Sequence, residues 1–200
     1  MTFKEFLATY DVPGAVVLLE GKRAVRDQDA DKLVAIGNML ASRSQHIIFR
    51  SGNAGGSDEL FAQGVSSVDA KRMEVVTPYS GHRKGANKSY KTYSLDSLNL
   101  VAEPEVVRYS RANKKTDHLI DKFVSGDRDR FAMKAAYIIR DTIKVVGATG
   151  ISRAAFGIFY DDLADPRSGG TGHTMNVCRL NKVPLADQRG WFAWLTEEAN

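Results

Sequence analysis

Two stretches of the sequence combine glycine with short hydroxyl side chains, and each one precedes a predicted helix. The first, SGNAGGSD, covers Ser51–Asp58, and the second, SGGTGHT, covers Ser168–Thr174. Glycine lets a ligand approach the backbone closely because it has no Cβ atom. The first N–H groups of a helix lack partners and lie at the positive end of the helix dipole. Each stretch is therefore a candidate binding site for a phosphate or a closely packed ribose.

Side chains within and near these stretches add hydrogen-bonding groups for such a ligand. Asp58 is suited to accept a hydrogen bond from a sugar hydroxyl, and Arg23, at the end of the first predicted strand, is suited to fork onto a phosphate. For the glycine-rich stretch, the alternative is a tight strand-to-helix connection in which the glycines only permit positive φ. For Arg23, the alternative is an ordinary exposed arginine. The predicted ligand-binding and phosphate-binding residues are Gly21, Arg23, Ser51, Gly52, Asn53, Gly55, Gly56, Ser57, Asp58, Gly169, Gly170, Thr171, Gly172, His173 and Thr174.

Aromatic and acidic residues near the predicted strand ends are candidates for contacts with a base or a sugar. Tyr79 and Tyr160 are predicted to stack on a base and Asp161 to accept from a sugar hydroxyl, although both tyrosines also fit core positions. Two carboxylates can cleave a glycosidic bond when one is protonated and the other ionised. The simpler alternative makes Asp58 a helix cap. If the protein is an enzyme, the predicted catalytic residues are Asp58, Glu59, Asp161 and Asp162.

The remaining motifs argue against several other kinds of site. No G-x-G-x-x-G follows a predicted strand, and GHRKGANKS (Gly81–Ser89) only imitates a P-loop, because its glycine lies three residues before Lys88. The spacing of histidine, cysteine and acidic residues indicates no metal site, and we predict no cofactor. Cys178 is the one cysteine, which excludes an internal disulfide and fits a buried helix position.

The composition bounds the class of protein. The 200 residues carry a net charge of +4, and 43% of them are hydrophobic and 26% charged. This balance predicts a globular protein whose mild positive charge suits an anionic ligand. No apolar run approaches the roughly 20 residues that span a bilayer, and the first residues do not resemble a signal peptide. Together with the single cysteine, these features predict a cytoplasmic protein with no membrane partner.

The elements that must position the two stretches alternate between strands and helices. Apolar runs predict strands, and the periodicity between them predicts helices, for example with Leu33, Ile36 and Leu40 on one helix face. The expected fold is α/β, a Rossmann-like doubly wound sheet, mostly parallel, with helices on both faces. We expect one domain over residues 1–200, with a lid or mainly helical insertion at 80–153. Predicted strands cover residues 14–23, 46–52, 73–79, 154–163 and 183–187.

Strand–GKR, strand–SGNAGGSDELFAQG, strand–TPY and strand–SGGTGHT follow one another in this order. This series resembles the SLOG superfamily, a Rossmann-like group that includes the Lonely Guy enzymes, the molybdenum-cofactor carrier proteins and DNA-processing protein A. The resemblance covers residues 14–79 and 154–187, and RSGNAGGSDELF is similar to the family's SGGAxGxDxxF loop. It implies an ADP-ribose-type, cyclic or mononucleotide ligand lying across both stretches, often in a dimer.

The resemblance also bears on catalysis. Lonely Guy enzymes carry P-G-G-x-G-T-x-x-E, whose glutamate acts at the ribosyl bond. Residues 168–176 match the glycines of this motif, but His173 stands at the position of the threonine and Asn176 at that of the glutamate. An amide cannot act as a carboxylate base. The resemblance therefore favours ligand binding over phosphoribohydrolase activity.

Three functions remain after these steps. The first is binding of a nucleotide-derived small molecule as a sensor, carrier or sequestering protein, in a homodimer or higher homo-oligomer. The second is hydrolysis or transfer at the N-glycosidic bond of a nucleotide. Binding of nucleic acid ranks third, since basic residues in the helical middle usually form a solvated face. Those basic residues are Arg108, Arg111, Lys114, Lys115, Arg128 and Arg130.

Overall fold

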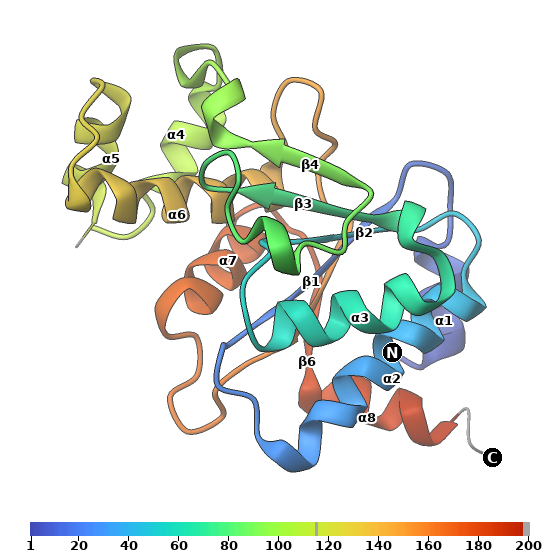
Figure 1. Ribbon diagram of the computed structural model, residues 1–200. Coiled ribbons are helices and arrows are strands. Elements are labelled where there is room, and N and C mark those ends of the chain that lie inside the picture. The colour runs from blue at the N-terminus through green and yellow to red at the C-terminus, as the bar shows by residue number, and fades with distance from the viewer. Residues whose placement is uncertain (115, 198–200) are drawn as a thin grey trace.

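The computed structural model describes residues 1–114 and 116–197. Within them, strands form one sheet in the order β4-β3-β2-β1-β5-β6, and every pairing is parallel (Figure 1). The strands are β1 (Val16–Gly21), β2 (Ile48–Ser51), β3 (Met73–Thr77), β4 (Lys91–Ser94), β5 (Phe156–Tyr160) and β6 (Leu185–Asp187). Buried apolar runs such as β1 are typical of a parallel sheet that is covered on both faces.

Helices cover both faces of this sheet (Figure 1). The core on one face involves α1 (Phe3–Tyr10), α2 (Asp27–Arg43), α3 (Ser57–Asp69) and α8 (Gln188–Glu197). The cores on the other face involve α4 (Pro104–Ser110), α5 (Asp117–Val124), α6 (Arg130–Val146) and α7 (Gly169–Leu180). The predicted Rossmann-like α/β fold is confirmed. No helix among the described residues is long and apolar enough to cross a membrane.

Residues of β1 point alternately to the two layers of helices. Val17 and Leu19 lie in the core shared with α2 and α3, whereas Leu18 lies in the core shared with α7. The same alternation directs Glu20 toward α6 and α7. Because β1 pairs with both β2 and β5, the strand order reverses at its carboxyl end. In open α/β sheets this is where ligands bind.

The structure differs from the sequence-based expectation in its smaller elements. The segment 80–153, expected to be a lid or mainly helical insertion, contains β4, which pairs with β3 at the sheet edge. An exposed edge strand carries polar side chains and so lacks the apolar pattern of an inner strand. The rest of this segment contains the helices α4, α5 and α6. The assignment of 80–153 as an insertion stays a prediction, although this segment supplies both β4 and α6.

Two further corrections concern helix starts. The N-cap of α3 is Gly56 rather than Asp58. The glycines expected in a loop before α7 belong to its first turn, because α7 begins at Gly169. At α1, which was not predicted, Thr2 and Glu5 form a reciprocal capping box.

Candidate functional site

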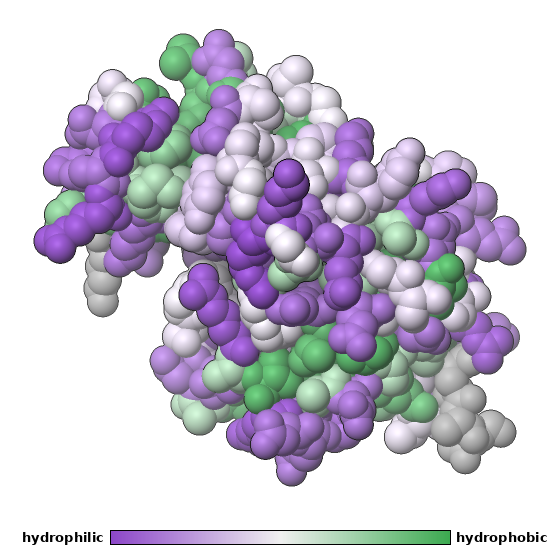
Figure 2. Space-filling model, viewed as in Figure 1, coloured by the Kyte–Doolittle hydropathy of each residue, from purple (hydrophilic) through white to green (hydrophobic). Residues whose placement is uncertain are grey.

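A cavity of about 560 Å³ lies at the carboxyl end of β1. Figure 2 shows the molecule hollowed between the lobe that contains α5 and α6 and the part formed by α7. Both glycine-rich stretches border this cavity, the first through Ala54 and Asp58 and the second through residues 168–171 and His173. The expectation that the two stretches meet at one cleft therefore agrees with the geometry. The lining also includes Gly21 and Arg23.

The first turn of α7 is open toward the cavity. Ser168 is its N-cap but makes no side-chain capping hydrogen bond, and no acidic residue lies in the first turn. A Cβ atom on Gly169 would meet nothing within 4 Å, and one on Gly170 would meet only an oxygen of Asp141, at 3.2 Å. The first N–H groups of a helix have no partner within it. The N-terminus of α7 thus presents backbone donors and a positive dipole end to the cavity.

Other residues of this turn have structural contacts. A Cβ atom on Gly172 would lie 1.7 Å from the carbonyl oxygen of Arg167, so this position requires glycine. Thr174 is buried, and its hydroxyl donates to the carbonyl of Gly170. Of the predicted second set, Gly169, Gly170, Thr171 and His173 line the cavity, whereas Gly172 and Thr174 do not.

The first stretch is closed by its own side chains. One carboxylate oxygen of Asp58 accepts hydrogen bonds from the backbone N–H groups of Gly52, at 3.0 Å, and Ala54, at 3.3 Å. The N–H of Asn53 donates to the Ser51 hydroxyl. These amides therefore already have partners, and the carboxylate of Asp58 occupies the position expected for an external anion.

Groups of the protein also fill the space beside the glycines of the first stretch. A Cβ atom on Gly52 would meet the Arg140 guanidinium at 2.7 Å, and one on Gly56 would lie 2.1 Å from the carbonyl oxygen of Arg23. Gly56 also has a φ of +76°. The Ser57 hydroxyl donates to the Lys22 carbonyl. The alternative interpretation, a tight strand-to-helix connection, describes Gly56 and Ser57 well.

Arg83 covers the outer side of the same stretch. Its guanidinium lies 3.6 Å from the position of a Cβ atom on Gly55, donates to the Asn53 carbonyl and pairs with Glu59 at 2.7 Å. The Asn53 side chain in turn donates to the His82 carbonyl. The segment after β3 thus folds over this stretch and holds it closed.

Charged residues of α6 form the floor of the cavity. Arg140 donates to Asp141 at 2.7 Å and to the Gly52 carbonyl at 2.8 Å, while the Lys144 ammonium lies 2.8 Å from Asp141 and also contacts Glu20. All four charged side chains are buried. Burial opposes ionisation of Asp141, but the adjacent Arg140 and Lys144 hold its pKa below its usual value. The cluster is therefore a network of compensated buried charges.

Two carboxylate oxygens at this cavity have no partner. Glu20 Oε1 and Asp58 Oδ1 are buried without a hydrogen bond to any described part of the chain. Burial raises the pKa of Glu20 to about 8, although the ammonium of Lys144 opposes this shift. Burial therefore favours the protonated form of Glu20. Glu20 can then donate a hydrogen bond, while Asp58 can accept one.

His173 and Cys178 lie on α7 near these charges. His173 Nε2 is 3.0 Å from the Thr142 hydroxyl, and burial lowers the pKa of the imidazole, which favours its neutral form. Burial raises the pKa of the Cys178 thiol to about 12, so Cys178 is a core residue rather than a nucleophile. Among the described residues, no group of three or more His, Cys, Asp or Glu side chains is arranged to hold a metal ion.

Comparisons with known proteins show no family for this chain. No protein-family model matches this chain, and neither does any curated protein. Among solved structures, the chain is similar to DNA processing protein A from Helicobacter pylori, with a TM-score of 0.47, 12% identity, and coverage of 90% of this chain and 67% of that one. That protein is described for its single-stranded DNA binding mode. The relation to the SLOG superfamily stays a prediction.

Several predicted residues lie away from the cavity. The Tyr160 ring belongs to the core with α2 and α3, and its hydroxyl donates to Asp29 at 2.8 Å. Asp161 accepts from the backbone N–H of Arg167 and Asp162, so it stabilises the loop after β5. The remaining predicted residues outside the lining are Ser51, Gly52, Asn53, Gly55, Gly56, Ser57, Glu59, Tyr79 and Asp162.

The basic residues considered for nucleic-acid binding make contacts of their own with other parts of the protein. Arg111 pairs with Asp121, and Arg128 donates to the carbonyl of Phe123 and stacks on its ring. Lys115 lies outside the described residues.

Sequence reasoning missed the side chains that α6 and β1 bring to the site. Lys134, Tyr137, Arg140 and Asp141 line the cavity from α6, and Glu20 lines it from β1. One signal was available. Glu20 ends an apolar strand, and Arg140 and Lys144 are spaced i, i+4 within an apolar helix, so they interrupt patterns that otherwise predict burial.

Proposed function

We propose that the cavity binds a nucleotide-derived small molecule. Its phosphate lies at the first turn of α7, and its sugar or base lies toward Glu20 and Asp58. One observation carries the proposal: the open N-terminus of a glycine-rich helix and two buried, unpartnered carboxylate oxygens line the same cavity, within the described residues. Its volume of about 560 Å³ is within the range of roughly 300–1,000 Å³ typical of small-molecule sites.

The end of the cavity at α7 suits an anion. The N–H groups of Gly169, Gly170 and Thr171 lie in the first turn, where the dipole favours negative charge. Arg23 and Lys134, both exposed, line the same cavity and add positive charge. A phosphate there would gain backbone donors together with a guanidinium and an ammonium.

The opposite end suits groups that both donate and accept hydrogen bonds. A buried polar atom without a partner costs free energy, which a ligand recovers when it supplies that partner. A protonated Glu20 offers a donor and Asp58 an acceptor. A sugar hydroxyl satisfies both, because it has one hydrogen and two lone pairs. An anionic group joined to a hydroxyl-rich part describes a nucleotide.

Catalysis at an N-glycosidic bond is not proposed. Of the four carboxylates predicted for that role, only Asp58 lines the cavity. A role as sensor, carrier or sequestering protein remains our proposal, as does a homo-oligomeric state.

Calorimetry with AMP, GMP and ADP-ribose tests this proposal. Gly170→Glu introduces a carboxylate between the first turn of α7 and Asp141, and we expect it to weaken binding by about tenfold or more. Gly190→Glu is the matched control, since Gly190 is exposed in the first turn of α8 and does not line the cavity. Equal affinity in Gly170→Glu and wild type would contradict the proposed phosphate position.

A further inference from the structure

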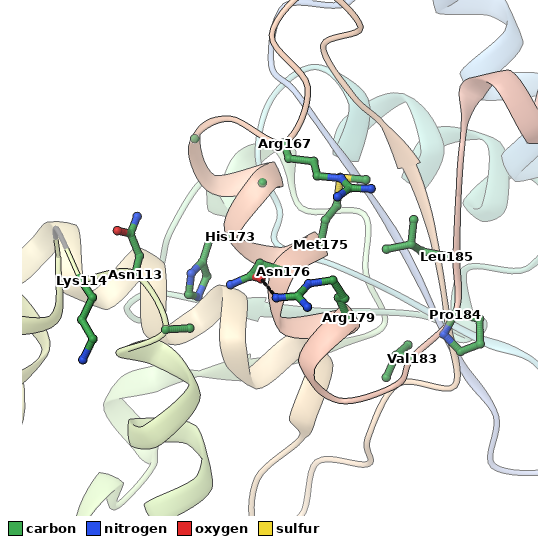
Figure 3. Close-up of a pocket in the computed structure, with 13 residues that line it drawn as sticks. Asn113, Lys114, Arg167, His173, Met175, Asn176, Arg179, Val183, Pro184 and Leu185 are labelled. Carbon is green, nitrogen blue, oxygen red and sulfur yellow. Dashed lines mark hydrogen bonds between the residues drawn. The ribbon is translucent and has the colours of Figure 1, made fainter.

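A second hollow, of about 630 Å³, lies on the other side of the α7 N-terminus. We call it the outer groove. Its walls are α7, the turn at residues 112–114, Arg167 and the segment 183–185 that enters β6 (Figure 3). Asn113, Gly169 and His173 line both the outer groove and the cavity. The two hollows are therefore adjacent at these three residues.

The outer groove is basic. Lys114, Arg167 and Arg179 line it, and none of its described lining residues is acidic. Arg179 is held by a hydrogen bond of 3.1 Å to the Asn176 side chain, which Figure 3 shows beside the groove. Asp187 lies outside the lining but near enough that Arg167 contributes to the lowering of its pKa. This excess of positive charge favours an anionic occupant.

Apolar side chains form another part of the outer groove. Met175, Val183, Pro184 and Leu185 line it together (Figure 3). A flat aromatic ring gains from burial against such a surface, and a polarisable methionine sulfur interacts favourably with rings. Cationic groups beside an apolar surface suit a heterocyclic base that carries a phosphate. The outer groove thus has the chemistry of a second nucleotide site.

We propose that the ligand is a dinucleotide, two nucleosides joined through phosphate groups, with one nucleoside in the cavity and the other in the outer groove. This inference rests on the proposed function and names the ligand class. The linking phosphates lie beside Gly169 and His173, where the two hollows meet and the positive end of the α7 dipole is closest. The neutral imidazole of His173 contributes hydrogen bonding there rather than charge.

Calorimetry with matched ligands tests this inference. AMP is compared with diadenosine diphosphate, and GMP with diguanosine diphosphate, so that each pair differs by a second copy of the same nucleotide. We expect at least one dinucleotide to bind about tenfold or more tightly than its mononucleotide, since both halves bind together. Arg179→Ala should remove most of that gain, because Arg179 lines only the outer groove.

Arg108→Ala is the control, because this exposed arginine lines neither hollow. Thermal unfolding of each variant verifies that it is folded. Equal binding within both ligand pairs would overturn the dinucleotide inference while the proposed function stands. A gain that survives in Arg179→Ala would also overturn it. If none of the four ligands binds, the dinucleotide inference fails, and the proposed function fails with it when ADP-ribose does not bind either.

Discussion

The stretch Ser51–Asp58 and the first turn of α7 contain the same types of residue, yet their backbone N–H groups differ in their partners. In the first stretch, the carboxylate of Asp58 accepts from Gly52 and Ala54. In α7, the side chain of Ser168 makes no capping bond and the first turn has no acidic residue. A glycine-rich turn before a helix is open to an anion only when no nearby carboxylate has taken the same position.

The glycines of the two regions also differ in what they accommodate. Gly56 and Gly172 are required because a backbone carbonyl of the protein itself lies within about 2 Å of a Cβ position. Gly169 faces open space, and Gly170 touches only Asp141. Glycine content alone does not separate these cases. The two cases differ in what lies beside the glycine, a carbonyl of the protein itself or open space.

The largest effect is expected at Gly56. Gly56→Ala combines a positive φ with a clash against the Arg23 carbonyl, and we expect it to lower the free energy of unfolding by about 3 kcal/mol. Gly81→Ala is the control, since Gly81 has a φ of +80° but no atom within 4 Å of its Cβ position. It should cost about 1 kcal/mol. Urea unfolding measures the free energy of unfolding of both variants. Similar decreases would mean that the positive φ alone, without the clash, accounts for the need for glycine at position 56.

The second-largest effect on stability is expected for a substitution of Asp58. Asp58→Ala leaves the N–H groups of Gly52 and Ala54 without their acceptor, and we expect a loss of about 2 kcal/mol. The corresponding change at α7, Ser168→Ala, removes no capping bond and should cost less than about 0.5 kcal/mol. Equal losses in thermal unfolding would contradict the difference between the two regions.

Glu20 should give the protein a measurable pH dependence. Unfolded Glu20 loses its proton near pH 4.5, whereas the folded protein retains it to about pH 8. Between these values the unfolded state binds fewer protons, so the free energy of unfolding falls as pH rises, by about 1.4 kcal/mol per pH unit for one proton. Glu20→Gln removes this contribution. We expect urea unfolding to show the variant gaining stability relative to wild type from pH 5 to pH 8.

The comparison of wild type with Glu20→Gln separates the pH dependence due to Glu20 from that due to other titrating groups. Burial lowers the pKa values of His82 and His173, which reduces stability as pH falls below about 6.5, but both histidines are present in wild type and variant. A difference between the two proteins that does not change with pH would show that Glu20 is ionised throughout this range.

The smallest effect is expected at Lys134, on the rim of the cavity. Lys134→Ala should weaken AMP binding by about two- to threefold, because an exposed charge is screened by water and salt. The effect should shrink further when the salt concentration is raised. Lys122→Ala on α5 is the matched control. A tenfold loss, or a loss that salt leaves unchanged, would place Lys134 in direct and buried contact with the ligand.

The sequence predicted the fold and the meeting of the two stretches, because alternating elements dictate a parallel sheet whose loops gather at one edge. It could not predict that Asp58 points back into its own loop, since this depends on the entry geometry of α3. Nor did it predict that Tyr160 lies in the core with its hydroxyl on Asp29, a residue 131 positions away.

The charged floor of the cavity was unpredictable for a different reason. Glu20, Asp141 and Lys144 come from β1 and α6, which lie more than a hundred residues apart, and only their contact explains how these charges are tolerated in the interior. The segment 80–153 was expected to be a lid, so its residues were not considered as part of a binding-site floor. Charged residues that interrupt the apolar pattern of α6 are the sequence signal for such a buried cluster.

Amide NMR during a titration with AMP tests the central claim most directly. The first turn of α7 is open and the stretch Ser51–Asp58 is closed. We therefore predict that the N–H signals of Gly169, Gly170 and Thr171 shift strongly, whereas those of Gly52 and Ala54 stay in place. Shifts at Gly52 and Ala54 without change at Gly169–Thr171 would contradict the account.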